Sequence, residues 1–89
     1  MIAGGDKKTG GDHREPLARA VRQSLGHYLE QLNGHDPDDL HRLVIEEVER
    51  PLFDCVMQHC DGNQTRAARV LGINRSTLRK KLRQYDLDY

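Results

Sequence analysis

The last third of the chain constrains the fold most, because it has the pattern of two short helices separated by a single glycine turn. Asn63 is a good N-cap for a helix over about 64–71, and Asn74 is a good N-cap for another over about 75–84. Gly72-Ile73 is the expected tight turn between the two. Two short helices joined in this way predict a helix-turn-helix, which lays its second helix in the major groove of DNA.

The distribution of charge supports the same interpretation. The 89 residues carry 14 Lys or Arg and 14 Asp or Glu, so the formal net charge is zero, but the charges are segregated. Residues 17–60 hold four Arg against eight acids, whereas residues 61–89 hold seven Lys or Arg against three acids. A basic half next to an acidic half indicates that one half faces a polyanion. The alternative is a solvated cationic helical hairpin without a ligand, and the coincidence of fold signature and charge favours DNA.

The length and the apolar pattern of the chain set the class of protein. Eighty-nine residues suffice for one small domain, and small domains commonly gain stability by self-association. No apolar run approaches the roughly 18 residues of a membrane helix, and no signal peptide is visible. Cys55 and Cys60 fall five residues apart on one expected helix, where they cannot bridge each other. These features predict a cytosolic protein without a membrane partner.

The first half of the chain predicts an arm followed by a helix. Residues 1–15 are rich in Gly and charge and are expected to form a disordered arm; the alternative is a contact arm for a partner or for the minor groove. Apolar residues then recur every three or four positions over 16–32, as on one face of a helix. Pro16 suits its first turn, and Asn33-Gly34 is a stop signal.

The next expected helix has a broad apolar stripe. Asp36 is placed to cap it and Pro37 to occupy its first position. The apolar phase continues across Pro51, which predicts one kinked helix that ends near Cys60. A broad stripe on a small protein indicates contact on more than one side, so we expect residues 16–60 to dimerise. The residues expected in the dimer core are Leu25, Leu29, Leu40, Val44, Val48, Leu52 and Val56.

Residues 61–89 are the expected DNA-binding region. Ala67 and Ala68 are small where the two short helices should cross, and the apolar contacts are expected from Val70, Leu71, Ile73, Leu78 and Leu82. Arg75 is the first choice for a base contact, because an N-cap residue such as Asn74 usually spends its side chain on backbone amides. Amide groups at the start of a helix attract phosphate. The full set of expected DNA contacts is Asn63, Thr65, Arg66, Asn74, Arg75, Thr77, Arg79, Lys80, Lys81 and Arg83.

Catalysis and metal binding are not indicated. Ser24 and Ser76 lack a base and an acid at a recognisable spacing. Cys55 and His59 form an i, i+4 pair, but a structural zinc site needs four ligands and the other histidines show no finger spacing. We therefore expect no enzyme, no cofactor and no metal. A dimerisation adaptor without DNA binding is a further alternative, which the basic second half opposes and a gel shift would decide.

The chain closely resembles the Fis family of bacterial nucleoid proteins. The matching residues are Tyr28, Gln31-Leu32-Asn33-Gly34, Asp39-Leu40, Leu43-Val44, Glu47-Val48-Glu49, Pro51-Leu52, Val56-Met57-Gln58, Gly62-Asn63-Gln64-Thr65-Arg66-Ala67-Ala68, Gly72-Ile73-Asn74-Arg75, Thr77-Leu78-Arg79-Lys80-Lys81-Leu82 and Tyr85. The resemblance covers roughly residues 16–85. It implies an all-α four-helix homodimer with a C-terminal helix-turn-helix, which regulates transcription and bends DNA in the cytoplasmic nucleoid.

The resemblance also carries expectations about single residues and partners. It implies that Asn74, Arg75, Thr77 and Lys80 face DNA, and that the two recognition helices of the dimer lie closer than one helical turn. Members of the family use an N-terminal β-hairpin to contact a DNA invertase, but residues 1–15 lack the apolar alternation of a hairpin, so this contact is not expected. RNA polymerase is a further candidate partner.

A second identity is compatible with the same helix-turn-helix. NtrC-like activators end in this motif, but they also carry an ATPase domain, and this sequence has no phosphate-binding loop. A C-terminal fragment of such an activator is therefore the alternative to a free-standing protein.

Overall fold

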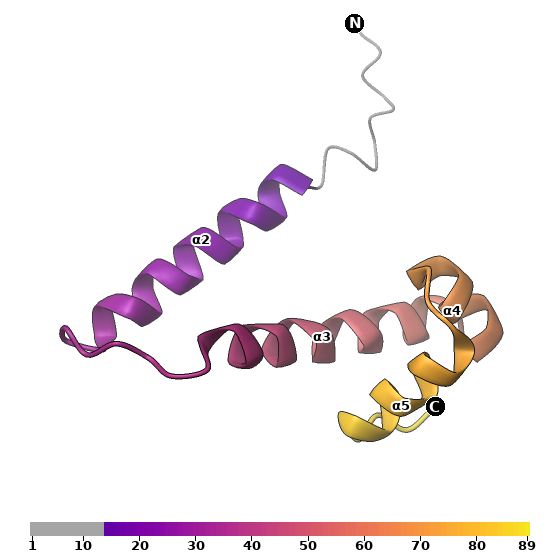
Figure 1. Cartoon of the computed structure of the whole chain (residues 1–89). Helices are drawn as coiled ribbons and strands as arrows, with labels where there is room; N and C mark the ends of the chain where they lie inside the picture. Colours follow the sequence, from indigo (N-terminus) through magenta and orange to yellow (C-terminus); the bar gives the residue numbers. More distant parts are fainter. Residues whose placement is uncertain (1–13) are drawn as a thin grey trace, which may run out of the picture. The chain divides into compact units, whose positions relative to one another are not determined.

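The computed structural model describes residues 14–89 and contains only helices over this range (Figure 1). The helices are α2 (Arg14–Gln31), α3 (Leu40–His59), α4 (Gln64–Leu71) and α5 (Arg75–Gln84). The predicted all-α fold is confirmed, and the predicted bounds of α4 and α5 agree with those observed. The chain divides into two compact units between Asp38 and Asp39.

Helix α2 begins two residues earlier than expected. Because its first residue is Arg14, the prediction of an arm that extends to residue 15 is wrong at its last two positions. Pro16 still lies in the first turn, where its missing N–H has no helical partner to lose. The rest of the predicted arm lies outside the described residues. The predicted stop is confirmed, since Asn33 (φ 53°) and Gly34 (φ 86°) both adopt left-handed backbone conformations directly after the helix.

The predicted start of α3 is wrong. The helix begins at Leu40 instead of after Asp36, and Asp39 precedes it with a left-handed backbone (φ 52°, ψ 34°) that no α-helix accommodates. Asp tolerates this conformation better than most residues, and its side chain accepts a hydrogen bond from Arg42 Nη2 at 2.9 Å. The Asp-Pro signal is therefore local, and the left-handed Asp39 overrides it.

Helix α3 continues through Pro51 and ends at His59, so the prediction of one helix across this proline is confirmed. The two halves of α3 differ in how far their apolar side chains are buried. In the first half, Leu43, Ile45 and Val48 are 39–44% exposed, whereas in the second half Phe53 and Met57 are buried. Only the second half of α3 therefore contributes to the core of its unit.

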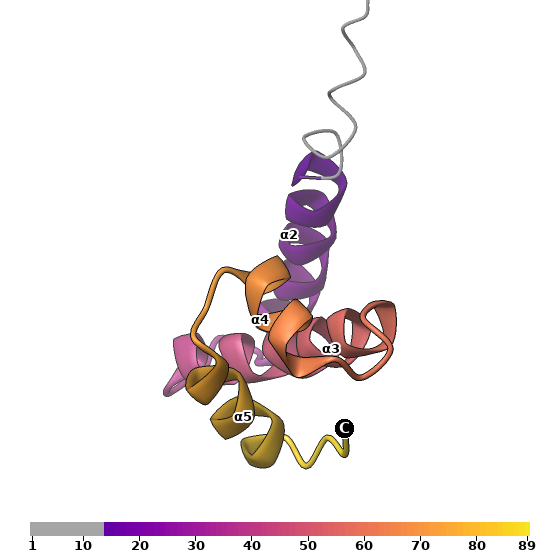
Figure 2. The same ribbon diagram turned by 90° about the vertical axis from the view of Figure 1, so that its right-hand side faces the viewer.

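The core lies where α4 and α5 gather against the second half of α3 (Figures 1 and 2). Its buried members are Phe53, Met57, Cys60, Ala67, Ala68, Leu78, Leu82 and Tyr85, with Val56, Leu71, Ile73 and Leu87 partly buried around them. Four of the five apolar contacts predicted for the helix-turn-helix are confirmed. Val70 is the exception: it is 55% exposed because it faces outward from α4.

Among the described residues, no helix is both long enough and apolar enough to span a membrane.

Candidate nucleic-acid interface

The corner between α3 and α4 is short and fully hydrogen-bonded. Asp61 (φ 53°) and Gly62 (φ 79°) reverse the chain in left-handed conformations. The N–H of Gly62 donates to Met57 O at 2.9 Å, and the N–H of Asn63 donates to Cys60 O at 2.9 Å. Because each backbone N–H of residues 60–63 donates to a carbonyl of α3 or of the corner itself, the end of α3 sets the direction of α4.

Helix α4 begins with the predicted cap. The side-chain oxygen of Asn63 accepts a hydrogen bond from the N–H of Arg66 at 3.0 Å, as an N-cap does. Thr65 and Arg66 in the first turn are exposed. This end of α4 therefore presents polar and cationic groups to solvent, next to the positive end of the helix dipole.

The turn between α4 and α5 lies where it was predicted, at Gly72-Ile73. Gly72 is left-handed (φ 74°, ψ 31°), and Ala68 O accepts hydrogen bonds from the N–H groups of both Gly72 (2.8 Å) and Ile73 (3.0 Å). Satisfying the last carbonyls of a helix in this way ends it abruptly. The positive φ explains why a glycine is needed here.

Asn74 occupies the N-cap position of α5, as predicted, but its side chain does not cap. Its backbone is extended (φ −69°, ψ 148°), and the structure gives it no side-chain hydrogen bond to the first turn. The expectation that the side-chain amide of Asn74 hydrogen-bonds to the backbone of the first turn is wrong. The Asn74 side chain is therefore exposed at the start of α5, beside Arg75, which is also exposed.

One face of α5 carries a continuous row of polar and basic side chains. Ser76, Thr77, Arg79, Lys80 and Arg83 together line a shallow hollow of about 300 Å³. The four exposed cations of the helix, Arg75, Arg79, Lys80 and Arg83, form no ion pair with any carboxylate of residues 14–89. Unpaired cations at this spacing form a surface that attracts a polyanion.

Lys81 differs from these four. Its ammonium lies 3.0 Å from Glu49 Oε1 on α3, and only 30% of its side chain is exposed. Tyr85, just past the end of α5, donates a hydrogen bond from its hydroxyl to the same carboxylate oxygen at 2.7 Å. That hydrogen bond is the main cause that lowers the pKa of Glu49, and Lys81 lowers it further.

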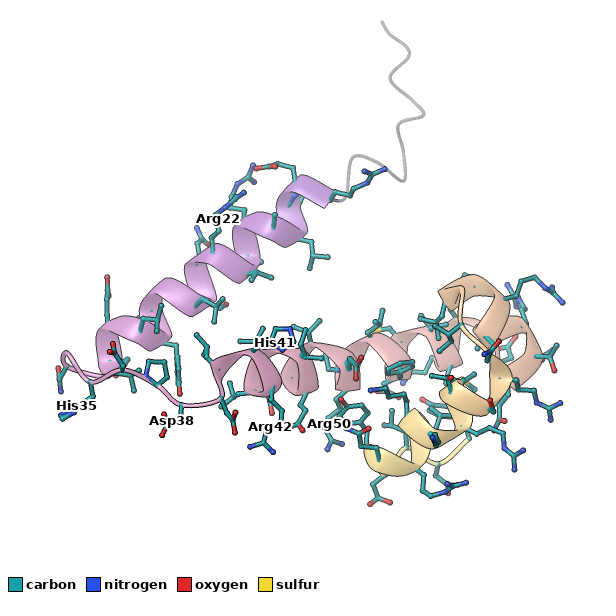
Figure 3. All side chains as sticks on the ribbon, in the orientation of Figure 1. Arg22, His35, Asp38, His41, Arg42 and Arg50 are labelled. Atoms are coloured by element: carbon teal, nitrogen blue, oxygen red, sulfur yellow. The ribbon has the colours of Figure 1, made fainter. Side chains whose placement is uncertain are left out.

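Arg50 also contacts Tyr85, through both its backbone carbonyl and its aromatic ring. Its Nη1 donates to Tyr85 O at 2.6 Å, and its guanidinium lies 5.4 Å from the centroid of the tyrosine ring. Arg50 extends from α3 on the side of α5 (Figure 3). Sequence reasoning missed this group of contacts, because they join residues about 35 positions apart and no local pattern predicts such a pairing.

The residues that follow α5 pack back on the same unit. The N–H of Leu87 donates to Leu82 O at 2.8 Å, and the Leu87 side chain is partly buried against the core. Tyr89 hydrogen-bonds through its hydroxyl to the Asp54 carboxylate, and Gln64 Nε2 donates to Tyr89 O at 3.1 Å. The hydrogen bond to Asp54 raises the pKa of Tyr89. The C-terminal segment therefore braces α4 against α3.

The remaining side chains offer little chemistry. Within residues 14–89, no group of three or more His, Cys, Asp or Glu side chains is placed to hold a metal ion. Cys55 is exposed, Cys60 is buried, and neither forms a disulfide.

This combination of a short capped helix, a left-handed glycine turn and a basic second helix defines a helix-turn-helix protein. Residues 44–85 match the family described as "Bacterial regulatory protein, Fis family". Over 79 residues the chain is 56% identical to DNA-binding protein Fis of Psychromonas ingrahamii, and this alignment covers 89% of this chain and 80% of that protein. It is also 56% identical over 75 residues to DNA-binding protein Fis of Proteus mirabilis and of Photobacterium profundum, with 84% of this chain and 76% of each relative covered. The chain belongs to the Fis family.

Proposed function

We propose that this protein is a bacterial regulator that binds double-stranded DNA as a homodimer, with α5 as the recognition helix. The observation that carries the proposal is the row of exposed α5 cations without carboxylate partners among the described residues. The relatives named DNA-binding protein Fis support it, and the region that matches the Fis family, residues 44–85, includes α5.

Within this interface the residues have different roles. Arg75 and Asn74 stand at the start of α5, where a side chain reaches base edges, and arginine can donate two hydrogen bonds to guanine. Thr77 and Arg79 follow on the helix. Lys80 and Arg83 meet phosphates, and Asn63, Thr65 and Arg66 bring the start of α4 to the backbone of the DNA.

The homodimer is supported by apolar surface that the single chain leaves uncovered. Helix α2 has no buried residue, although Leu17 and Leu29 are 64% and 44% exposed. Val48 and Leu52, on α3, are each 44% exposed. Such surface is what a partner subunit would cover. The proposed dimer core is Leu25, Leu29, Leu40, Val44, Val48, Leu52 and Val56, and each of these side chains is exposed or only partly buried.

We further propose that the dimer bends DNA. The fixed corner at residues 61–63 leaves the recognition helices no freedom to adjust their spacing, while straight DNA offers successive major grooves about 34 Å apart. If the helices lie closer than this, the DNA must curve, at a cost of order 1–6 kcal/mol that depends on the sequence between the contacts. Circular-permutation gel mobility tests the bend, and equal migration of fragments with central and terminal sites would exclude it.

The proposed cellular location and protein partner of this regulator are based on its proposed binding to DNA. A regulator of chromosomal DNA acts in the bacterial cytoplasm, within the nucleoid, and RNA polymerase is its candidate protein partner. A contact with a DNA invertase is not part of this proposal, since the part of the chain on which that contact would depend lies outside the described residues.

The salt dependence of DNA binding tests the function. Three or four neutralised phosphates per subunit predict a slope of log K against log salt of about −5 to −7 for the dimer. Arg75→Ala should cost about 1–3 kcal/mol and remove the preference between sequences, whereas Lys80→Ala should weaken all sequences alike. Fluorescence anisotropy with specific and random duplexes measures both, and an affinity that does not change with salt would contradict the proposal.

A further inference from the structure

The cations of α5 fall into two groups that face different parts of the molecule. Arg79, Lys80 and Arg83 line the outer hollow of the helix. Lys81 instead lines a second hollow, of about 210 Å³, between α3 and α5, together with Glu46, Glu49 and Tyr85 among others. Consecutive residues of an α-helix point about 100° apart, so the neighbours Lys80 and Lys81 have separate surroundings.

Glu49 is the fixed partner of Lys81. One of its carboxylate oxygens receives both the Lys81 ammonium at 3.0 Å and the Tyr85 hydroxyl at 2.7 Å. The hydrogen bond from Tyr85 and the ion pair with Lys81 both lower the pKa of Glu49, so this carboxylate remains charged at neutral pH. With only 23% of the Glu49 side chain exposed, the pair is screened less than the Arg19–Glu15 ion pair on α2, whose side chains are 60% and 65% exposed.

The neighbouring contacts keep this arrangement in register. Arg50 donates to the carbonyl of Tyr85 and lies over its ring, and the Phe53 and Tyr85 rings stack with their centroids 6.3 Å apart. Three residues of α3 thus hold the C-terminal end of α5. For Lys81 to reach DNA it would have to leave Glu49, and the Glu49 carboxylate would then lose its cation and keep only the hydrogen bond from Tyr85.

We propose that Glu49 is a positioning residue of the DNA-binding surface, which removes Lys81 from the phosphate-neutralising cations and uses it to fasten the end of α5 to α3. This inference rests on the proposed DNA-binding function. It assigns the role of phosphate contact to Lys80 and denies it to Lys81, contrary to the expectation from the sequence alone.

The salt dependence of DNA binding separates the two lysines, because each phosphate contact contributes about 0.9 to the slope. Lys80→Met should reduce the magnitude of the slope by about 0.9 per subunit, whereas Lys81→Met should leave the slope at its wild-type value. If Lys81→Met reduces the slope as much as Lys80→Met does, the proposal is wrong. A wild-type protein without salt-dependent binding would instead contradict the proposed function itself.

Glu49→Gln tests the role of the carboxylate. Neutralising it should free Lys81 and steepen the slope by up to about 0.9 per subunit. The double variant Glu49→Gln with Lys81→Met should return to the wild-type slope, and Glu49→Asp, which keeps the charge, should retain it. An unchanged slope in Glu49→Gln would overturn the role of Glu49. Circular dichroism of each variant establishes that it is folded, and the comparison of Lys80→Met with Lys81→Met decides the role of Lys81 even if Glu49→Gln unfolds.

Discussion

The two units of this protein stand in contrast. The unit that contains the helix-turn-helix buries Met57 and Leu78 completely and covers them with residues from α3, α4 and α5. Helix α2, by contrast, also has an apolar face but not one buried side chain. The first half of α3 resembles α2 in this respect, since Leu43, Ile45 and Val48 remain 39–44% exposed.

The difference shows that an apolar pattern predicts burial but does not tell whether the same chain or a second molecule covers the apolar face. The second half of α3 finds its partners within about 35 residues of the same chain, whereas α2 finds none in its own unit. Most of the stability of a helix in a protein comes from packing of its apolar face, so we expect the 18-residue α2 to gain its stability from contacts outside its own unit. The contrast can be tested by comparing substitutions of buried core residues with substitutions of exposed apolar residues.

The largest effect is expected from Met57→Asp. Met57 is 0% exposed, and a buried unpaired charge costs several kcal/mol, which should unfold α4 and α5. Val70→Asp is the matched control, because Val70 lies on α4 but is 55% exposed. Circular dichroism and urea unfolding should show loss of structure for Met57→Asp only. Equal stability of the two variants would mean that the core of this unit is not where the structure has it.

Leu52→Asp should act on the dimer instead. Leu52 is 44% exposed in the single chain and belongs to the proposed dimer core, so a charge there should dissociate the subunits and reduce the helicity of α2. Val70→Asp again serves as the control and should remain dimeric. Light scattering at micromolar concentration measures the mass. A wild-type protein that is a stable, folded monomer of 10.2 kDa would refute the homodimer.

A smaller effect is expected at the start of α4. Asn63→Ala removes the cap to the N–H of Arg66 and should lower the free energy of unfolding by about 1 kcal/mol. Asn74→Ala is its counterpart at the start of α5, where no side-chain cap exists, and should change stability little. Urea denaturation distinguishes the two. A similar loss in both variants would show that Asn74 caps α5 after all.

The weakest effect is expected at alkaline pH. Burial, followed by the hydrogen bond to Glu49, raises the pKa of Tyr85 from 10.0 to about 12. The unfolded chain therefore releases this proton first, so stability should fall as the pH rises from about 10 towards 12. In Tyr85→Phe this part of the pH dependence should disappear, whereas Tyr28→Phe should keep it. Urea midpoints across this range provide the measurement.

Local signals were sufficient for the helix-turn-helix and insufficient elsewhere. Asn63 and Gly72 act on groups within four residues of themselves, and for that reason the bounds of α4 and α5 could be predicted. Asp36-Pro37 also has a strong local signal, but the left-handed Asp39 prevails over it. The hydrogen bonds that join Glu49 and Arg50 to Tyr85 depend on how α5 packs against α3, which a local sequence pattern does not predict.

The missing side-chain cap at Asn74 has a consequence for local opening of the helix. Without the hydrogen bond that Asn63 provides for α4, the first turn of α5 forgoes about 1 kcal/mol of local stability, which corresponds to roughly fivefold more frequent opening. In hydrogen-exchange measurements the amides of this turn should therefore exchange faster than those at the start of α4. The end of α5 that we propose to read bases is thus expected to fray more readily than the start of α4 before DNA binds.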